Sequence, residues 1–69
     1  MDLLQISLAA ARVNAGLTQD EAAKAVHVTK QTLVNWELGR TEPTVSKFRE
    51  LSDVYGIPVE NIFLPSKSN

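Results

Sequence analysis

Apolar residues recur along the chain at helical spacing, and glycines interrupt them, which divides the sequence into short helices. A first helix is expected from Asp2 or Leu3 to Ala15, because its apolar residues repeat at intervals of four, three and four. Gly16 follows this segment and is the usual left-handed residue that ends a helix. The predicted helix therefore has a narrow apolar stripe, formed by Leu4, Leu8, Ala11 and Ala15.

The stretch from Thr18 to Arg40 predicts two further helices joined by a tight turn. Thr18 and Glu21 have the spacing of a capping box, which opens a helix. Thr29 can cap the next helix, and Gly39 can end it in the left-handed conformation. We expect these helices at about Gln19 to Val26 and Lys30 to Leu38. Two short helices in this arrangement are typical of a helix-turn-helix.

The turn between these two helices contains His27, where many helix-turn-helices carry glycine because the backbone is left-handed. Histidine is among the better-tolerated non-glycine residues at positive φ. We therefore predict a positive φ at His27, with a destabilisation of roughly 1 kcal/mol relative to glycine.

The rest of the chain predicts two more helices and a polar tail. Pro43 disfavours helix at the residue before it, and Thr44 is a good N-cap, so a helix is expected from about Val45 to Tyr55, ended by Gly56. Its buried side is predicted to be Val45, Phe48, Leu51, Val54 and Tyr55. A last short helix is expected from Pro58 to Phe63, burying Val59, Ile62 and Phe63.

These elements predict an all-α fold of five short helices around one core. Residues 1–64 would form the domain, and residues 65–69 a flexible C-terminal tail. A chain of 69 residues fits a single small domain. Its longest apolar run is far short of a membrane span, and Asp2 stands where a secretory signal would carry a basic residue, so we expect a cytoplasmic protein.

The composition argues against catalytic and metal-dependent functions. The chain has no cysteine, and His27 is its single histidine, so no metal site and no thiol nucleophile are expected. It also lacks a glycine-rich phosphate loop and a Ser–His–acid constellation, so we expect neither an enzyme nor a cofactor or small-molecule substrate. The net charge is −1, so binding to nucleic acid would require segregation of charge by face.

The second helix of the predicted helix-turn-helix combines a buried side with a polar side. Leu33 and Trp36 are expected to face the core, with Val34 a further candidate. The opposite side carries polar residues that can contact base edges: glutamine and asparagine suit adenine, lysine suits guanine, and a threonine methyl suits thymine. These base-reading candidates are Lys30, Gln31, Thr32 and Asn35. The alternative is an ordinary solvated helix face.

The same residues, taken with their spacing, resemble the Cro/lambda-repressor-like helix-turn-helix family, also called the XRE family. The resemblance covers about Leu4 to Phe63. It rests on Arg12, Ala15-Gly16-Leu17-Thr18-Gln19, Glu21-Ala22-Ala23, Trp36-Glu37, Gly39-Arg40, Pro43, Leu51 and Tyr55-Gly56. The family implies a five-helix domain that acts as a transcriptional regulator, usually through a symmetric dimer. His27 departs from the family pattern at the turn.

The resemblance also implies roles for individual residues. The residues expected at DNA phosphates are Gln19, Thr29, Arg40, Thr41, Ser46 and Lys47. Arg12 and Glu37 match a family pair that joins the first helix to the third, and we expect that ion pair here, rather than two independent surface charges.

The sequence therefore predicts a sequence-specific DNA-binding regulator whose helix 30–38 enters the major groove of a near-palindromic double-stranded DNA operator as a homodimer. The dimer contact is expected at the C-terminal end, from Ile57, Val59, Ile62, Phe63 and Leu64, although the same residues can simply seal the core. The alternative function is a helix-turn-helix protein-interaction module, such as an antitoxin or antirepressor partner, with weak or no DNA binding.

Overall fold

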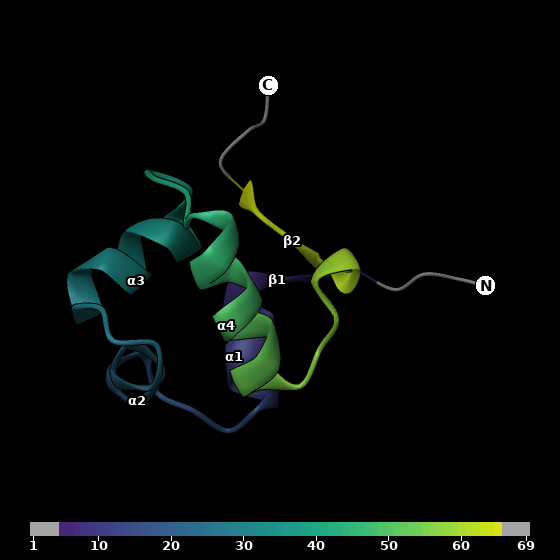
Figure 1. Cartoon of the computed structure of the whole chain (residues 1–69), viewed down its shortest axis with the longest axis horizontal. Coiled ribbons are helices and arrows are strands. Elements are labelled where there is room, and N and C mark those ends of the chain that lie inside the picture. The colour runs from purple at the N-terminus through teal and green to yellow at the C-terminus, as the bar shows by residue number, and fades with distance from the viewer. Residues whose placement is uncertain (1–4, 66–69) are drawn as a thin grey trace.

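The structure is a computed structural model that describes residues 5–65, and in that range it contains four α-helices, one turn of 3-10 helix and two short strands. Helices α2 and α3 lie on one side of α1 and α4, and the strands lie on the other side (Figure 1). The bounds are β1 Ile6–Ser7, α1 Leu8–Asn14, α2 Gln19–Ala25, α3 Lys30–Leu38, α4 Val45–Tyr55, η1 Val59–Asn61 and β2 Ile62–Phe63.

The first helix is shorter than the sequence predicted. It begins at Leu8 because Ser7 is its N-cap: the Ser7 hydroxyl accepts a hydrogen bond from the backbone N–H of Ala10 at 3.0 Å. The two residues before the helix are extended and form β1. The prediction of helix at Gln5, Ile6 and Ser7 was therefore wrong, and the earlier part of the predicted segment, including Leu4, lies outside the described residues.

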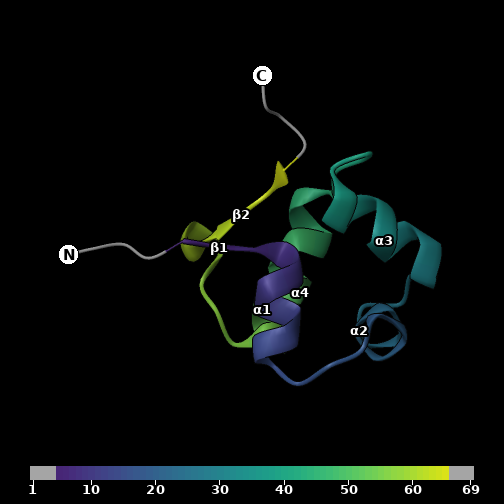
Figure 2. The ribbon, with the colours of Figure 1, turned by 180° about the vertical axis from the view of Figure 1, so that it is seen from behind.

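The fifth predicted helix is absent, because its residues form η1 and then β2. Strands β1 and β2 pair in parallel, with Ile6 opposite Ile62 and Ser7 opposite Phe63. Beside the strands, the Gln5 side-chain amide donates to the Glu60 carbonyl at 3.2 Å. Figure 2 shows the two strands side by side, so segments from opposite ends of the described chain close the fold together. Within the described residues the fold is mostly helical, with four α-helices where five were predicted, and it includes a small sheet.

The predicted starts of the other three helices are confirmed by their caps. Thr18, Thr29 and Thr44 each accept a hydrogen bond, at 3.1 Å, from the backbone N–H three residues later. Glu21 completes the capping box by accepting from the Thr18 N–H at 2.9 Å. His27 has φ 61°, so the predicted left-handed turn is also confirmed.

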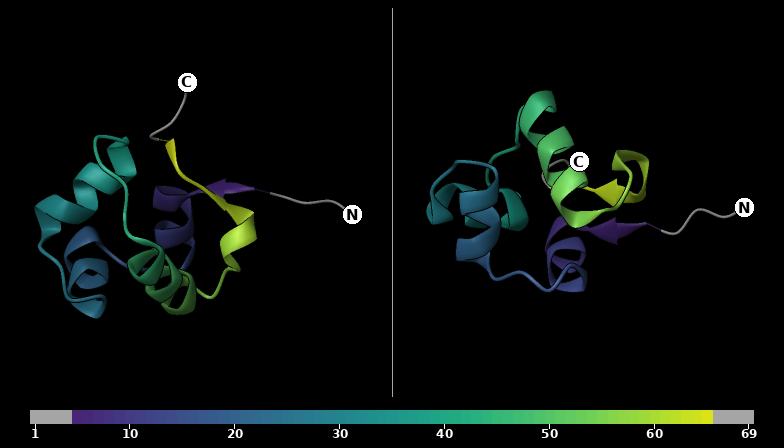
Figure 3. Two further views of the ribbon diagram at one scale, coloured as in Figure 1. Left: turned by 45° about the horizontal axis from the view of Figure 1, so that its top comes forward. Right: turned by 60° about the horizontal axis from the view of Figure 1, so that its bottom comes forward.

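The core lies between the helices and is sealed by the strands (Figure 3). Its buried residues are Leu8, Ala11, Ala22, Ala23, Val26, Leu33, Trp36, Leu51, Tyr55 and Ile62. Of the residues predicted to be buried on α4, Val45 is 77% exposed and Val54 is 37% exposed. Phe63 on β2 is also exposed, at 46%. The predictions for Val45 and Val54 were wrong because α4 packs on the core along the narrow stripe of Phe48, Leu51 and Tyr55. Phe63 is exposed because it follows the buried Ile62 on a strand, where successive side chains point to opposite faces.

Gly39, which ends α3, is constrained both by its backbone and by its surroundings. It has φ 82°, and a Cβ at this position would lie 3.2 Å from the carbonyl carbon of Pro65. Pro65 belongs to the predicted tail, whose remaining residues 66–69 lie outside the described range. The end of the described chain therefore lies against the turn that follows α3.

We expect Gly39→Ala to lower the free energy of unfolding by roughly 2 kcal/mol, because alanine is strained at positive φ and its methyl group meets Pro65. Gly56→Ala is the matched control, since Gly56 has φ 71° and open space where its Cβ would be. It should cost about 1 kcal/mol. Urea unfolding of both variants measures the difference, and equal losses would mean that the Pro65 contact adds nothing.

Candidate nucleic-acid interface

Helix α3 separates a buried side from a polar side. Leu33 is fully buried and Trp36 is 6% exposed, and both belong to the core. The four predicted base-reading residues do not belong to this buried side. Lys30 and Gln31 are exposed, and Thr32 and Asn35 are partly exposed. The structure therefore brings these four residues together on the accessible part of α3.

A chain of side-chain hydrogen bonds connects the accessible part of α3 to the turn after it. Gln31 Nε2 donates to Asn35 Oδ1 at 3.0 Å, and Arg40 Nη1 donates to the same oxygen at 3.4 Å. The backbone N–H of Arg40 also donates to the Asn35 carbonyl at 2.9 Å. Arg40 was predicted only as a phosphate contact, and its link to Asn35 was not predicted.

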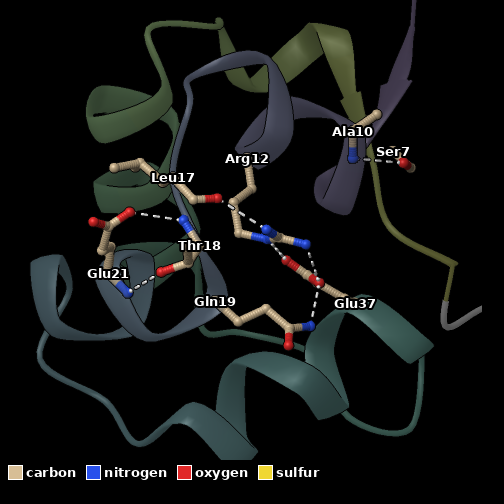
Figure 4. A network of polar contacts seen from close by, with 8 residues as sticks. All are labelled: Ser7, Ala10, Arg12, Leu17, Thr18, Gln19, Glu21 and Glu37. Atoms are coloured by element: carbon tan, nitrogen blue, oxygen red, sulfur yellow. Dashed lines mark hydrogen bonds and ion pairs between the residues drawn. The ribbon is translucent and has the colours of Figure 1, made fainter.

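Glu37, on α3, links this helix to α1 and α2 through side-chain hydrogen bonds. Its Oε2 accepts from Arg12 Nε on α1 at 2.7 Å, and its Oε1 accepts from Arg12 Nη2 at 3.3 Å (Figure 4). Gln19 Nε2, in the first turn of α2, also donates to Oε1, at 3.0 Å. Arg12 Nη1 donates to the Leu17 carbonyl at 2.9 Å. The side chains of Arg12 and Glu37 are 14% and 5% exposed, so this ion pair is largely removed from water.

Arg12, Gln19 and Glu37 form a hydrogen-bonded group, called here the Glu37 network. It holds the side chain of Gln19, one of the predicted phosphate contacts, in place. Because one amide hydrogen of Gln19 is held by Glu37, its Nε2 retains a second hydrogen for another acceptor. The same bond positions the start of α2 relative to α3. The family resemblance predicted the Arg12–Glu37 pair, but nothing in the sequence indicates that Gln19 joins it.

Tyr55 lies beside the Glu37 network with its hydroxyl buried. Its Oη has no hydrogen-bond partner among the described residues. The pKa of Tyr55 is raised to about 12, chiefly because burial penalises the charged phenolate and also because Glu37 is negative, while Arg12 opposes the shift. The neutral phenol is therefore the form that the folded state favours.

This shift predicts a loss of stability at alkaline pH. Since the folded-state pKa of Tyr55 lies above the unfolded value of about 10, its contribution is complete below that value and is lost as pH rises towards about 12. The loss should be on the order of 1–3 kcal/mol. Tyr55→Phe is the control: the wild type should lose more stability over this interval than the variant, and parallel losses would contradict the prediction.

Lys47, another predicted phosphate contact, is engaged within the protein. Its Nζ donates to the Val26 carbonyl at 2.7 Å and lies 3.4 Å from Glu50 Oε1. Val26 is the C-cap of α2 and precedes the left-handed residue His27. The ammonium group therefore sits where α2 presents unpaired carbonyls and the negative end of its dipole.

We expect Lys47→Met to lower the free energy of unfolding by about 1–2 kcal/mol, because it removes a charged hydrogen bond at the end of α2. The matched control is Arg49→Met, which removes an exposed cation from the same helix and should change stability by less than about 0.5 kcal/mol. Thermal unfolding of both variants measures this, and an unchanged Lys47→Met protein would contradict it.

The other predicted phosphate contacts lie around α3. Thr41 and Ser46 are exposed in the loop after α3 and in the first turn of α4, and Arg40 is exposed at the start of that loop. The Thr29 hydroxyl caps α3 and shares a 2.9 Å hydrogen bond with the Thr32 hydroxyl. Thr29 and Thr32 therefore already have local partners.

The predicted dimer surface is smaller than the sequence suggested. Ile62 is 5% exposed and belongs to the core, while Ile57 and Leu64 are partly buried against it. Val59 is partly exposed, and Phe63 presents the most apolar surface of this group, at 46% exposure. Most of the set therefore seals the core.

Two kinds of feature are absent from the described part of the chain. Residues 5–65 contain no group of three or more histidine, cysteine or acidic side chains with the arrangement of a metal site. None of the helices in this range is long and apolar enough to cross a membrane.

Comparison with known proteins identifies the family. A helix-turn-helix family model matches residues 8–62. The cryptic phage CTXphi transcriptional repressor RstR of Vibrio cholerae is 31% identical over 58 residues, which cover 84% of this chain and 52% of that protein. The chain thus spans about half the length of that repressor.

Two archaeal proteins match over most of their own length. An HTH-type transcriptional regulator of Methanocaldococcus jannaschii is 31% identical over 48 residues, covering 70% of this chain and 73% of that protein. An HTH-type transcriptional regulator of Archaeoglobus fulgidus is 32% identical over 53 residues, covering 77% and 76%. No solved structure matches the chain. The chain belongs to the helix-turn-helix family of transcriptional regulators, in the Cro/lambda-repressor-like (XRE) group that its residues resemble.

Proposed function

We propose that this regulator binds operator DNA with α3 in the major groove of a half-site, where Lys30, Gln31, Thr32 and Asn35 contact base edges. The observation that carries the proposal is the accessible polar side of α3. It lies opposite the buried Leu33 and Trp36, so the core holds the helix while its polar side chains remain available.

The proposed contacts to the DNA phosphates come mainly from uncharged groups of the protein. Gln19, Thr41 and Ser46 flank α3 and donate from amide and hydroxyl groups, with Thr29 as a further candidate in its cap. Arg40 and Lys30 are the exposed cations of α3 and its following turn. Lys47 would reach a phosphate only by sharing or leaving its bond to Val26.

Because few cations contact phosphates in this proposal, the affinity for DNA should depend only weakly on salt concentration. Each phosphate neutralised by a cation contributes about −0.9 to the slope of log K against log salt. Arg40 is the one exposed cation among the proposed phosphate contacts, because Lys30 is assigned to a base edge, so the interface should give a slope of about −1 per chain. A shallow but clear salt dependence is therefore expected from a protein of net charge −1.

We further propose that two copies bind a near-palindromic operator whose half-sites lie about one helical turn apart. The exposed side chain of Phe63, with Ile57, Val59 and Leu64 beside the buried Ile62, is the candidate contact between copies. Sedimentation of the free protein tests this contact. A protein that stays monomeric at high concentration would exclude this contact between copies.

A second candidate function is a protein-interaction module, such as an antitoxin or antirepressor partner. It is favoured by the near-neutral net charge and by Val45, an apolar residue that is 77% exposed in the first turn of α4. The accessible residues of α3 argue for DNA instead, because a protein-binding surface usually centres on aromatic or aliphatic anchors.

Selection of bound DNA from a randomised pool tests the proposed function. An enriched inverted repeat would support specific binding by a dimer. Enrichment of a single half-site would keep DNA binding and exclude the dimer. If no sequence is enriched even at low salt, the DNA function fails and the protein-interaction function becomes the better account.

A further inference from the structure

The side chains of Gln31 and Asn35 form a pair that has two possible hydrogen-bonded arrangements. Each amide carries one acceptor oxygen and an NH₂ donor, so either residue can donate to the other. In the structure Gln31 Nε2 donates to Asn35 Oδ1 at 3.0 Å. The opposite arrangement, in which Asn35 donates to Gln31, would present the reverse pattern of donors and acceptors to DNA.

The contact from Arg40 is compatible with only one of these two arrangements. A guanidinium group has only donors, so it can bond to Asn35 only through the oxygen of that side chain. Arg40 Nη1 lies 3.4 Å from Asn35 Oδ1, which makes this oxygen the common acceptor of two donors. The backbone supports the contact, because Gly39 has φ 82° and the Arg40 N–H returns to the Asn35 carbonyl at 2.9 Å.

We propose that Arg40 determines sequence specificity by fixing the orientation of the Asn35 side-chain amide, so that the Gln31–Asn35 pair recognises adenine. This inference rests on the proposed function, since it requires α3 to contact bases. It differs from a phosphate contact, which was the role predicted for Arg40 and which would carry no sequence information.

The base follows from the groups that remain unpaired. With Oδ1 taken by two donors, Asn35 offers its Nδ2 hydrogens, while Gln31 still offers Oε1 as an acceptor. The complementary target is an acceptor next to a donor. Adenine alone presents both on one base in the major groove, at N7 and N6, whereas guanine presents two acceptors and cytosine a donor. Without Arg40 the amide pair has both arrangements open, and the preference for adenine should relax.

The experiment compares selected DNA motifs for the wild type and three variants. Asn35→Ala identifies the base pair that Asn35 contacts, which should carry adenine in the wild-type motif. Arg40→Met should reduce the preference for adenine at that same base pair by roughly tenfold and leave the other positions of the motif unchanged. Arg49→Met is the matched control: it removes an exposed arginine that belongs to none of the proposed DNA contacts and should leave the preference at that base pair intact.

The remaining outcomes overturn the inference in distinguishable ways. If Arg40→Met weakens binding to all sequences equally, lowers the salt slope by about 0.9 and keeps the motif, Arg40 is a phosphate contact only. If the base pair identified by Asn35→Ala does not carry adenine in the wild-type motif, the assignment of the base is wrong. If the wild type enriches no motif, the proposed function itself fails. Circular dichroism of each variant verifies that it is folded.

Discussion

Replacing Glu37 by glutamine is expected to lower the free energy of unfolding by roughly 3–5 kcal/mol, the cost of breaking a buried ion pair by removing one partner. The Glu37 side chain is only 5% exposed, and both of its oxygens accept hydrogen bonds. A glutamine has one acceptor oxygen and turns an NH₂ donor towards Arg12 or Gln19, which also donate at this site. The positive charge of Arg12 is then left largely buried without its partner.

Urea unfolding measures this effect, and Glu50→Gln is the matched control. Glu50 pairs with Lys47 at 3.4 Å and its side chain is 42% exposed, so losing that pair should cost at most about 1 kcal/mol. Arg12→Lys should also be destabilising, because an ammonium group cannot reproduce the two-point contact with Glu37. If Glu37→Gln unfolds at the same urea concentration as the wild type, Glu37 does not hold the three helices together.

The double variant Gln31→Ala with Asn35→Ala is expected to lose sequence discrimination while keeping the fold. The Gln31–Asn35 pair makes one two-point contact to a base, worth about 1–3 kcal/mol of discrimination, so affinity for the selected operator should fall by roughly 5- to 150-fold. Affinity for unrelated DNA should change little, because the exposed cations Lys30 and Arg40 remain. Competition binding against operator and unrelated DNA gives both numbers.

Lys24→Gln with Asp20→Asn is a suitable control for the double variant, since both residues are exposed on α2 and neither belongs to the proposed base contacts. Discrimination by this control should stay within a few-fold of the wild type. If the Gln31 and Asn35 double variant still prefers its operator as strongly as the wild type, bases are not read by these amides, and the proposed role of Arg40 fails with them.

The sequence predicted the helices whose ends carry local signals. Thr18, Thr29 and Thr44 each begin a helix where expected, because an N-cap bond spans only three residues and depends on nearby sequence. Ser7 carries the same kind of signal at the start of α1, but the apolar repeat that begins at Leu4 suggested a longer helix.

The errors at the two ends of the chain have a different cause. Strands β1 and β2 contain two residues each, and Ile6 pairs with Ile62 across nearly the whole sequence. No local pattern of two residues indicates such a pairing. The predicted first and last helices therefore extended into segments that tertiary contacts hold in an extended conformation.

The candidate site was predicted to a similar extent. The accessible residues of α3 follow from helical periodicity, because Leu33 and Trp36 fix which side faces the core. The bond from Lys47 to the Val26 carbonyl joins elements that are far apart in sequence, and the bond from Arg40 to Asn35 depends on the conformation of the turn at Gly39. Neither follows from residue type and spacing.

The most direct test of the central claim is nuclear magnetic resonance of the labelled protein titrated with its selected operator. We expect the largest changes in backbone amide shifts on residues 30–35 of α3, at Arg40 and Thr41, and at Gln19 in the first turn of α2. Changes confined to η1 and β2, with the amides of α3 unaffected, would contradict the claim that α3 binds DNA.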